Sequence, residues 1–205
     1  MPVPVTILDS QICNLASIAR ALERAGGSVT VAQDAAAIKA ASRLVLPGVG
    51  SFPAAMRAFN QRGLSQPLRD FAKTGKPMIG VCLGMQLLME IGEEFEQTPG
   101  LGIVPGRVRA IQAKGLAIPH MGWNAVEVKR VDPLLNGLQS GDYLYFVHSF
   151  VCEPQYSGDV LCTTEYGERF CSLLRRGNVW GVQAHPEKSQ RAGAALLKNF
   201  LELAP

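Results

Sequence analysis

The sequence predicts an α/β fold: a central, mostly parallel sheet with helices on both faces, and antiparallel hairpins in the C-terminal half. In the N-terminal half, short apolar runs without polar alternation are separated by segments with apolar residues at helical spacing. Strands of this kind are buried on both faces, as in a parallel sheet. From about residue 100 to 182, short strand-like runs alternate with Gly, Pro and Asn turns, a pattern typical of hairpins. Because 205 residues suit one large domain, we expect a single domain over residues 1–205.

Strands and helices alternate in the N-terminal half. Residues 3–8 form an apolar, β-branched run that predicts a buried strand, and apolar positions from Ile12 onward then follow helical spacing up to Gly26–Gly27. The elements expected next are a strand at 29–31, a helix at 35–40, a strand at 44–46, a helix capped by Ser51 and a helix at about 65–73. Working loops of parallel sheets lie at the carboxyl ends of the strands, and the Pro47–Gly50 loop and the turn at Cys82 both satisfy this rule.

The C-terminal half predicts hairpins and one last helix. The expected strands lie at 143–151, 160–164, 170–174 and 179–182, with two of the turns at 166–168 and 176–178. A helix over about 190–203 carries a stripe of apolar residues that includes Leu196 and Phe200. No repeat, low-complexity stretch or domain linker interrupts the chain.

Composition and charge exclude several classes of protein. A net charge of +3, with Lys and Arg scattered singly, argues against a nucleic-acid-binding surface. No apolar run approaches the roughly 18 residues that span a membrane, and the N-terminus lacks the pattern of a signal peptide. The five cysteines have irregular spacing, which fits neither a disulfide framework nor a metal site. We therefore expect a cytoplasmic protein that uses no membrane, nucleic acid or metal.

The chain is organised around the stretch from Lys76 to Gln86. A short apolar strand runs into Gly80-Val-Cys-Leu-Gly84 and directly on into a helix, which is the layout of a nucleophile elbow with Cys82 in the nucleophile's place. Glycines are expected there because so sharp a turn brings backbone against backbone. The start of a helix favours a thiolate, the nucleophilic form of cysteine. The alternative is a buried, inert cysteine.

A cysteine nucleophile needs a histidine as general base and a third group to orient the ring. Of the three histidines, His185 is followed by Pro186, which disfavours helix and predicts an extended segment. Residues two apart in an extended chain point to the same side, so Glu187 is placed to accept a hydrogen bond from the His185 ring. Neither His120 nor His148 has a carboxylate in that position. The alternative for His185 is a surface loop histidine.

Three of these motifs together resemble a known family. The Gly-Val-Cys-Leu-Gly-Met-Gln stretch around Cys82, Pro-Gly-Val-Gly at residues 47–50 and His-Pro-Glu at residues 185–187 are similar to the class I (triad) glutamine amidotransferases. The resemblance covers about residues 5–201 and implies the α/β fold of that family.

Finer motifs resemble one branch of the family, the glutaminase subunits of imidazole glycerol phosphate synthases of histidine biosynthesis. They are PHMGWN at residues 119–124, YFVHSF at 145–150 and HPEKS at 185–189, and Asn14 after the first strand also fits. The chain departs from many members at residues 10–13, where they have Tyr and Gly, and at Phe150, where they have Tyr. Neither departure touches the triad.

The resemblance implies a cysteine-dependent glutaminase that hydrolyses L-glutamine to glutamate and ammonia through Cys82, His185 and Glu187. It implies that the ammonia passes, within a heterodimer, to a (β/α)₈-barrel cyclase subunit, which makes imidazole glycerol phosphate and AICAR. The oxyanion is expected to be held by the N–H of Leu83, from the elbow geometry, and by a second N–H from Val49 or Gly50. No metal or cofactor is implied.

Five further residues receive expected roles. The resemblance implies that Gln86 holds the substrate and that the backbone of Ser149 and Phe150 binds its amino-acid end; the alternatives are a solvated helix residue and edge-strand packing. Lys188 resembles an interface lysine that pairs with an acidic residue of the barrel. Trp123 would be an aromatic anchor at the same interface. The alternative for both residues is ordinary surface, and for Trp123 alone the default is core packing.

Two alternative functions stay open from the sequence. The chain could serve another triad amidotransferase (anthranilate, guanylate or pyridoxal phosphate synthase), or be a cysteine peptidase of similar fold. The PHMGWN stretch and the Lys188-Ser189 continuation argue against these. A non-catalytic regulatory or scaffolding module of the same fold should have lost a triad residue, and none is missing.

Overall fold

The computed structural model describes residues 1–9 and 15–204, so the predictions on Ile12, on Asn14 and on residues 10–13 lie outside the described residues. Among the described residues, the main sheet has the order β2-β1-β3-β4-β14-β13-β11-β7-β5-β6, with β12 beside β13 and β9 beside β12. Its strands are β1 (Val3–Leu8), β2 (Gly27–Ala32), β3 (Leu44–Gly48), β4 (Met78–Cys82), β5 (Met89–Gly92), β6 (Thr98–Pro99), β7 (Val104–Ala110), β9 (Glu127–Val128), β11 (Phe150–Pro154), β12 (Val160–Tyr166), β13 (Glu168–Arg176) and β14 (Val179–Val182). The pairs among β2, β1, β3, β4 and β14 are parallel, whereas those of β13 with β14, β11 and β12 are antiparallel. This confirms the predicted fold class.

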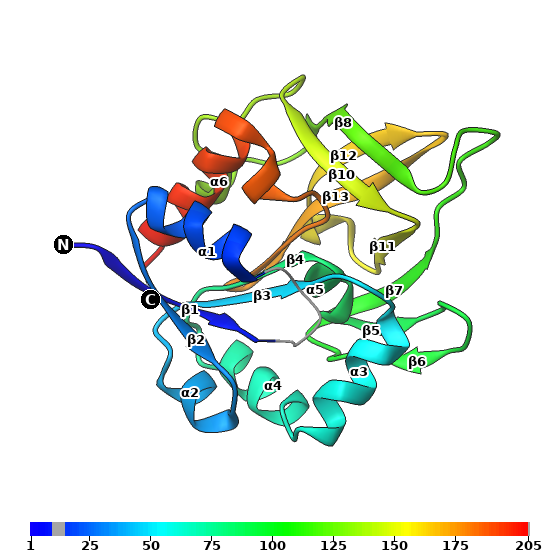
Figure 1. The fold of residues 1–205 in the computed structure, drawn as a ribbon. Helices are drawn as coiled ribbons and strands as arrows, with labels where there is room; N and C mark the ends of the chain where they lie inside the picture. Colours follow the sequence, from blue (N-terminus) through cyan, green and yellow to red (C-terminus); the bar gives the residue numbers. More distant parts are fainter. Residues whose placement is uncertain (10–14, 205) are drawn as a thin grey trace.

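Helices cover both faces of the parallel part of the sheet (Figure 1). The helices are α1 (Leu15–Arg24), α2 (Ala35–Ala40), α3 (Phe52–Gln61), α4 (Ser65–Lys73), α5 (Leu83–Leu87) and α6 (Gln190–Glu202), with short 3₁₀ turns at Pro133–Leu135, Ser157–Asp159 and Pro186–Lys188. Ile18 of α1 and Leu196 of α6 belong to the same apolar cluster as Val45, whereas Phe59 of α3 packs in a second cluster with Leu46. Neighbouring residues of β3 thus face opposite layers, as expected for a strand buried on both sides.

The N-terminal elements match the predicted ones closely, with two differences. The third strand continues through Gly48, so the loop after it is shorter than predicted. Ser51 stands at the N-cap of α3 as predicted, but its side chain makes no capping hydrogen bond. Glu94 Oε2 instead accepts from the N–H of Phe52 at 2.7 Å. A carboxylate from a distant loop therefore satisfies the helix end.

The prediction of one strand over 143–151 is wrong. The segment divides into β10 (Tyr143–His148), which pairs with β8 (His120–Ala125) in a separate two-stranded sheet, and β11, which belongs to the main sheet. The chain changes sheet at Ser149, because the Ser149 carbonyl accepts from Ile111 N–H at 2.9 Å and Phe150 then pairs with Ala110. The predicted hairpins β12–β13 and β13–β14 are confirmed, with Gly167 and Gly177 at positive φ in their turns.

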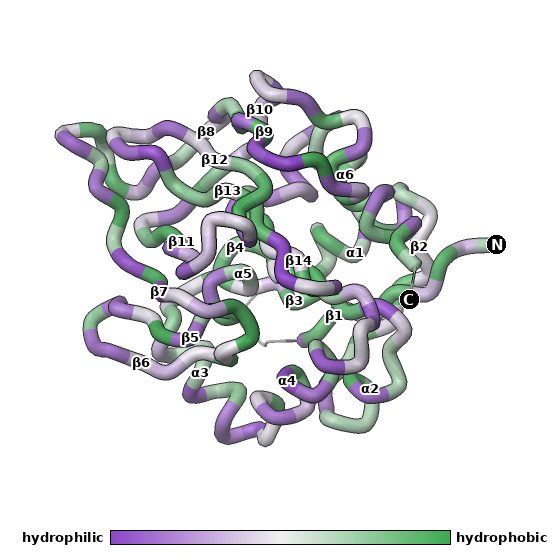
Figure 2. The backbone as a smooth tube through the Cα atoms, turned by 180° about the vertical axis from the view of Figure 1, so that it is seen from behind, coloured by the Kyte–Doolittle hydropathy of each residue, from purple (hydrophilic) through white to green (hydrophobic). Residues whose placement is uncertain are grey.

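Hydropathy follows this architecture. Figure 2 shows the hydrophobic colour on the central strands and more hydrophilic colour on the outer loops, such as that at β6. Within residues 1–9 and 15–204, no helix combines the length and the apolar character needed to cross a membrane. The cysteines in these ranges (82, 152, 162 and 171) are all free and buried.

Candidate active site

The segment around Cys82 is a tight turn between β4 and α5. Cys82 has φ 54° and ψ −115°, an unfavourable backbone conformation for a residue with a side chain. A Cβ on Gly80 would lie 2.5 Å from the Gly84 carbonyl oxygen, and one on Gly84 would lie 1.8 Å from the Leu46 carbonyl oxygen. These contacts confirm the predicted approach of backbone to backbone, and they leave room for glycine alone. The turn therefore projects Cys82 from the carboxyl end of a central strand.

Parallel pairing brings two other chain segments next to Cys82. Gly48 of β3 is in register with Cys82, so the residues that follow it, Val49 and Gly50, lie beside the elbow. On the other side, Val182 of β14 is in register with Val81, which places Gln183 next to Cys82. The carboxyl ends of three neighbouring strands thus meet at the sulfur, as the position rule for parallel sheets predicts.

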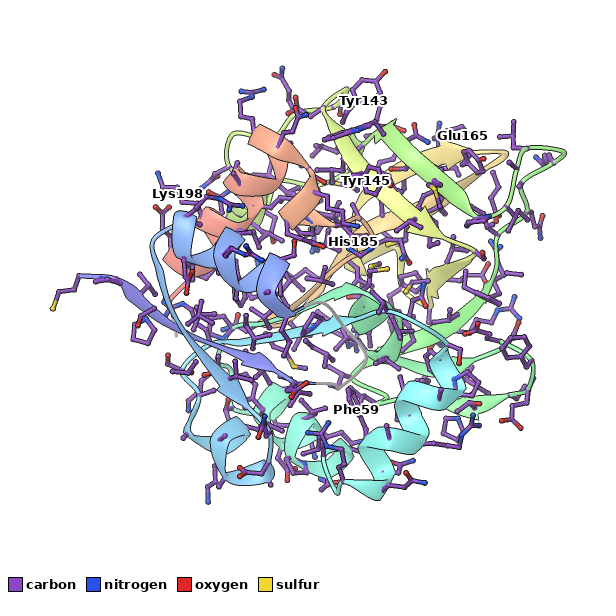
Figure 3. All side chains as sticks on the ribbon, viewed as in Figure 1. Phe59, Tyr143, Tyr145, Glu165, His185 and Lys198 are labelled. Atoms are coloured by element: carbon purple, nitrogen blue, oxygen red, sulfur yellow. The ribbon has the colours of Figure 1, made fainter. Side chains whose placement is uncertain are left out.

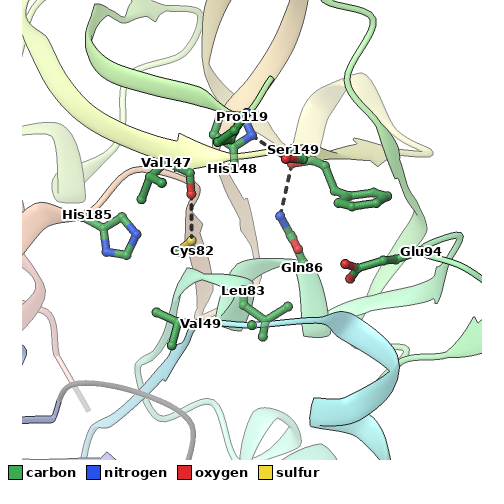
Figure 4. A pocket seen from close by; sticks show the side chains of 12 residues that line it. Val49, Cys82, Leu83, Gln86, Glu94, Pro119, Val147, His148, Ser149 and His185 are labelled. Atoms are coloured by element: carbon green, nitrogen blue, oxygen red, sulfur yellow. Dashed lines mark hydrogen bonds between the residues drawn. The ribbon is translucent and has the colours of Figure 1, made fainter. Parts of the chain in front are cut away.

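A cavity of about 350 Å³ opens at this point (Figure 4). Its lining consists of Val49, Gly50, Cys82, Leu83, Gln86, Glu94, Pro119, Val147, His148, Ser149, Phe150 and His185. The predicted nucleophile, base, oxyanion residues and substrate residues all belong to this lining. The volume is in the range of pockets that bind small molecules.

His185 and Glu187 form the predicted pair. His185 Nδ1 lies 2.8 Å from Glu187 Oε1, and both side chains are buried. His185 is extended as predicted, but Glu187 lies in a 3₁₀ turn, so the turn rather than a continuous strand brings the carboxylate behind the ring. His185 is held in place by its N–H, which donates to the Tyr145 carbonyl at 2.8 Å, and Figure 3 shows these two residues close together beside α6.

The second ring nitrogen of His185, Nε2, is available to Cys82. His185 Nε2 is buried and has no hydrogen-bond partner among the described side chains and backbone. Burial lowers the pKa of His185, but the interaction with the Cys82 sulfur and the hydrogen bond to Glu187 outweigh it and raise the pKa from 6.5 to about 10. The sulfur and the carboxylate therefore both favour the protonated, positively charged form of the ring.

The other two histidines are bound to each other. His148 Nδ1 is 2.9 Å from the Phe150 carbonyl oxygen, which only accepts, so that nitrogen carries the proton. His148 Nε2 then accepts from His120 Nδ1 at 3.0 Å, and His120 Nε2 accepts from Asn124 Nδ2 at 3.3 Å. Every ring nitrogen is used, and both rings are neutral in this arrangement.

Burial agrees with that assignment. It lowers the pKa of His120 to about 4, and it lowers the pKa of His148 to about 4 despite the hydrogen bond to Phe150. Between pH 6.5 and about 4 the unfolded chain binds more protons at these rings than the folded one. Stability is therefore lost as the pH falls through this window. Although His148 lines the cavity, it has no free nitrogen with which to act as a base.

Gln86 is buried, so the alternative of a solvated helix residue is wrong. Its Nε2 donates to the Phe150 carbonyl at 3.1 Å and to Gln183 Oε1 at 3.0 Å. The Ser149 carbonyl is also taken, by Ile111 N–H at 2.9 Å. The carbonyls of Ser149 and Phe150 thus serve the fold, which leaves their N–H groups as the backbone atoms for a ligand.

The two predicted interface residues lie on one surface. Lys188 is exposed, and its Nζ lies 5.6 Å from the centre of the Tyr145 ring. Trp123, which is 44% exposed, packs edge-on against the same Tyr145 ring, with ring centres 5.9 Å apart. Tyr145 therefore joins the two residues, next to the backbone contact that holds His185. The alternative of core packing for Trp123 is excluded by its exposure.

Two site residues were missed by the sequence reasoning. Gln183 Nε2 lies 3.8 Å from Cys82 Sγ, and the period of two that pointed to Glu187 also places Gln183 on the side of His185. Glu94 lines the cavity from the loop after β5. No local pattern marks Glu94, because its position depends on how the short loop 93–97 between β5 and β6 packs against the start of α3.

Comparison with known proteins adds three findings. The sequence model of the family described as class-I glutamine amidotransferase matches residues 6–204. Over 204 residues the chain is 48% identical to the imidazole glycerol phosphate synthase subunit HisH of Salinibacter ruber, covering 97% of this chain and 94% of that one. It is 46% identical over 200 residues to the same subunit of Moorella thermoacetica, covering 98% and 95%.

Solved structures agree in fold. A crystal structure described as a glutamine amidotransferase has a TM-score of 0.76 at 22% identity and covers 97% of both chains. The structure of PurLQS from Thermotoga maritima has a TM-score of 0.77 at 19% identity and covers 98% of this chain and 99% of that chain. At these identities the likeness concerns the fold alone.

Proposed function

Because the chain belongs to the class I glutamine amidotransferase family, among the glutaminase subunits of imidazole glycerol phosphate synthase in histidine biosynthesis, we propose that Cys82, His185 and Glu187 are its catalytic triad. The observation that carries this proposal is the buried His185–Glu187 pair at 2.8 Å, with the free ring nitrogen left to the elbow cysteine. We propose further that the chain works in the cytoplasm as one amidotransferase domain.

The proposed reaction begins at the side-chain amide of glutamine. The Cys82 sulfur attacks the amide carbon, and His185 gives its proton to the nitrogen, which leaves as ammonia. A glutamyl thioester remains on Cys82. His185 then takes a proton from water, which attacks the thioester carbon and releases glutamate and the sulfur. Glu187 keeps the ring oriented and stabilises its charged form.

The developing oxyanion needs donors from two segments. Leu83 opens α5, so its N–H points out at the turn next to the sulfur. The register of Gly48 with Cys82 supports Val49 or Gly50 as the source of the second N–H. Gly50 has φ +97°, a conformation that favours glycine, and a Cβ added at Gly48 would lie only 3.0 Å from Leu83 Cβ, so both positions of this loop favour glycine.

The remaining lining suits the amino-acid end of glutamine. Gln86, with its Nε2 already bound, offers its oxygen as an acceptor, and the N–H groups of Ser149 and Phe150 offer donors for the α-carboxylate. Glu94 is the carboxylate of the cavity lining, and one of its oxygens is bound to Phe52 N–H. We assign Glu94 to the α-ammonium group of the substrate, because a carboxylate there would pair with the positive charge.

A Glu94→Gln substitution tests this assignment. Loss of one charge-assisted hydrogen bond, about 1.5–3 kcal/mol, should raise KM for glutamine by roughly 10- to 100-fold and leave kcat within about twofold. Glu93→Gln is the matched control, since Glu93 pairs with Arg107 at 3.3 Å and does not line the cavity. Steady-state glutaminase assays give both constants. An unchanged KM for Glu94→Gln would remove Glu94 from the substrate site.

The partner is the cyclase subunit of the synthase, and we propose that it docks, as a heterodimer, over Lys188, Tyr145 and Trp123. These residues form a contiguous surface next to His185, so a partner seated there would receive ammonia close to where it is released. Trp and Tyr are enriched among the residues that anchor protein interfaces. The Val49 side chain, 43% exposed, lies at the mouth of the same cavity.

One experiment tests this proposed function as a whole. Glutamate release is measured for the isolated chain, for its complex with the cyclase subunit, and for the complex with the phosphoribosyl ligand of the cyclase. We expect low, low and high rates, because the Gly48–Val49 peptide between glycines can turn its C=O or its N–H toward the oxyanion, and a ligand-bound partner would select the N–H. Equal rates in all three samples would contradict this control, and no glutamate in any sample would favour a non-catalytic module.

A further inference from the structure

A chain of side-chain hydrogen bonds ends on the Cys82 sulfur. Gln183 is fully buried, and its Nε2 lies 3.8 Å from Cys82 Sγ. Gln183 Oε1 accepts from Gln86 Nε2 at 3.0 Å, and the same Gln86 nitrogen donates to the Phe150 carbonyl at 3.1 Å. The chain thus runs from the backbone of β11 through two amides to the sulfur. None of the roles proposed above uses Gln183.

The direction of every bond in this chain follows from its first atom. A carbonyl oxygen accepts and never donates, so Gln86 must present its nitrogen to Phe150. That nitrogen can in turn only donate, so the Gln183 atom that faces it must be the oxygen. The Gln183 nitrogen then has to face the sulfur. The orientation of both amides is therefore set by the Phe150 carbonyl, although the two ends of an amide look alike.

The first atom of the chain is itself held in place. His148 Nδ1 donates to the same Phe150 carbonyl at 2.9 Å, and His120 supports His148 from behind at 3.0 Å. Both rings are neutral, as shown above, and each has one fixed tautomer. A carbonyl with two donors cannot turn toward a third group without losing one of them. The anchor is consequently rigid, and so is the amide that it orients.

We infer that Gln183 is a positioning residue for glutamine hydrolysis, which directs an N–H at Cys82 Sγ, holds the sulfur in place and favours its thiolate form. This inference rests on the proposed function of Cys82. An N–H donor binds a thiolate more strongly than a thiol, because the acceptor is charged. The Val147 carbonyl, 4.0 Å from Sγ, has the opposite preference, since it accepts from the thiol.

The other groups around the sulfur do not replace this donor. His185 faces it with a proton, whereas His148 is neutral and Glu94 carries negative charge on the far side of the cavity. Cys152 of β11 is close enough to interact, but burial raises the pKa of its thiol well above 9.0 and keeps it uncharged. His185 and Gln183 are thus the two described side chains that favour a thiolate here.

The first test uses Gln183→Met, an unbranched side chain of similar length without donors. The rate of Cys82 alkylation by iodoacetamide is measured against pH in the isolated protein without glutamine, and peptide mapping scores the modification of Cys82 alone. We expect the midpoint of this pH profile to rise by about one unit, which corresponds to about tenfold slower alkylation below the midpoint. Ser172→Ala is the control. Ser172 is fully buried and its carbonyl accepts from the Gln183 N–H, but its hydroxyl takes no part in the chain of hydrogen bonds that ends on the sulfur. Its profile should match that of the wild type.

A second variant separates positioning from a general loss of packing. Gln86→Met removes the hydrogen bond that Gln86 donates to Gln183 Oε1, so its effect on Cys82 alkylation should act through the orientation of Gln183. The double variant should therefore be no slower than Gln183→Met alone, whereas two independent packing defects would multiply. Independent, multiplicative effects would overturn the inference, as would an unchanged profile in Gln183→Met. Thermal unfolding of each variant checks that the fold is retained.

Steady-state kinetics complete the test in the ligand-activated complex. Gln183 does not line the cavity, so Gln183→Met should lower kcat by about tenfold and leave KM within about twofold. A raised KM at constant kcat would instead make Gln183 a substrate residue and contradict the inference. Failure of the proposed function would look different, because then the wild-type complex itself would release no glutamate.

Discussion

A Cys82→Ala variant of the complex is expected to lose glutamine-dependent synthesis by about 10⁴-fold or more and to keep nearly all synthesis from added ammonium salt. Cys82 is the proposed nucleophile, and among the described residues it is the one cysteine in the cavity lining. In the proposed division of labour, the ring-closing chemistry takes place in the partner and takes only its nitrogen, as ammonia, from this chain. Product formation is measured with glutamine and with ammonium chloride as alternative nitrogen sources.

The structure supplies a matched control for this substitution. Cys152→Ala also removes a buried thiol, but Cys152 lies outside the cavity and burial keeps its pKa high. It should leave both activities within about twofold. If Cys82→Ala abolished the ammonia-dependent reaction as well, the two sites could not be separate in the way proposed.

A His185→Ala variant is expected to lower glutaminase turnover by about 10²-fold or more, the usual scale of acid–base assistance. The neighbouring sulfur and the Glu187 carboxylate raise the pKa of His185 and so favour the charged ring, which can supply a proton to the leaving ammonia. Without the ring, the amide nitrogen leaves unprotonated and the sulfur loses its charged neighbour. Turnover of the ligand-activated complex with saturating glutamine is the measurement.

The other histidines provide the comparison. His120→Ala and His148→Ala remove rings that are neutral and fully hydrogen-bonded, so neither should prevent acylation in the way that His185→Ala does. They are expected to disturb the Phe150 carbonyl and, through it, the orientation of Gln86. A loss in His148→Ala as large as that in His185→Ala would reopen the identity of the base.

The features that the sequence predicted best are those settled by short-range geometry. The glycines of the elbow follow from one sharp turn. The His185–Glu187 pair was predicted from their short spacing and from Pro186, although a 3₁₀ turn rather than an extended segment makes the contact. The strands at 3–8 and 44–46 follow from uninterrupted apolar runs, which are typical of strands buried on both faces. In these places, local stereochemistry and the tertiary structure favour the same conformation.

The features that it missed depend on pairing between distant segments. The division of 143–151 into two strands arises because β7 and β8 compete for consecutive residues, and neither partner is visible from the segment itself. Ser51 loses its expected capping role because Glu94 arrives from another loop. Gln183 acquires its contact with Cys82 only through the parallel register of β14 with β4. Burial of Gln86 likewise depends on β11 closing over the helix.

The most direct test of the central claim is to trap the covalent intermediate. The ligand-activated complex is mixed with glutamine and quenched with acid, and the peptide that contains Cys82 is examined by mass spectrometry. The proposed mechanism predicts one glutamyl group on Cys82 in the wild type, formed far more slowly in His185→Ala. Release of glutamate without any adduct on Cys82, or adduct formation at the wild-type rate in His185→Ala, would contradict it.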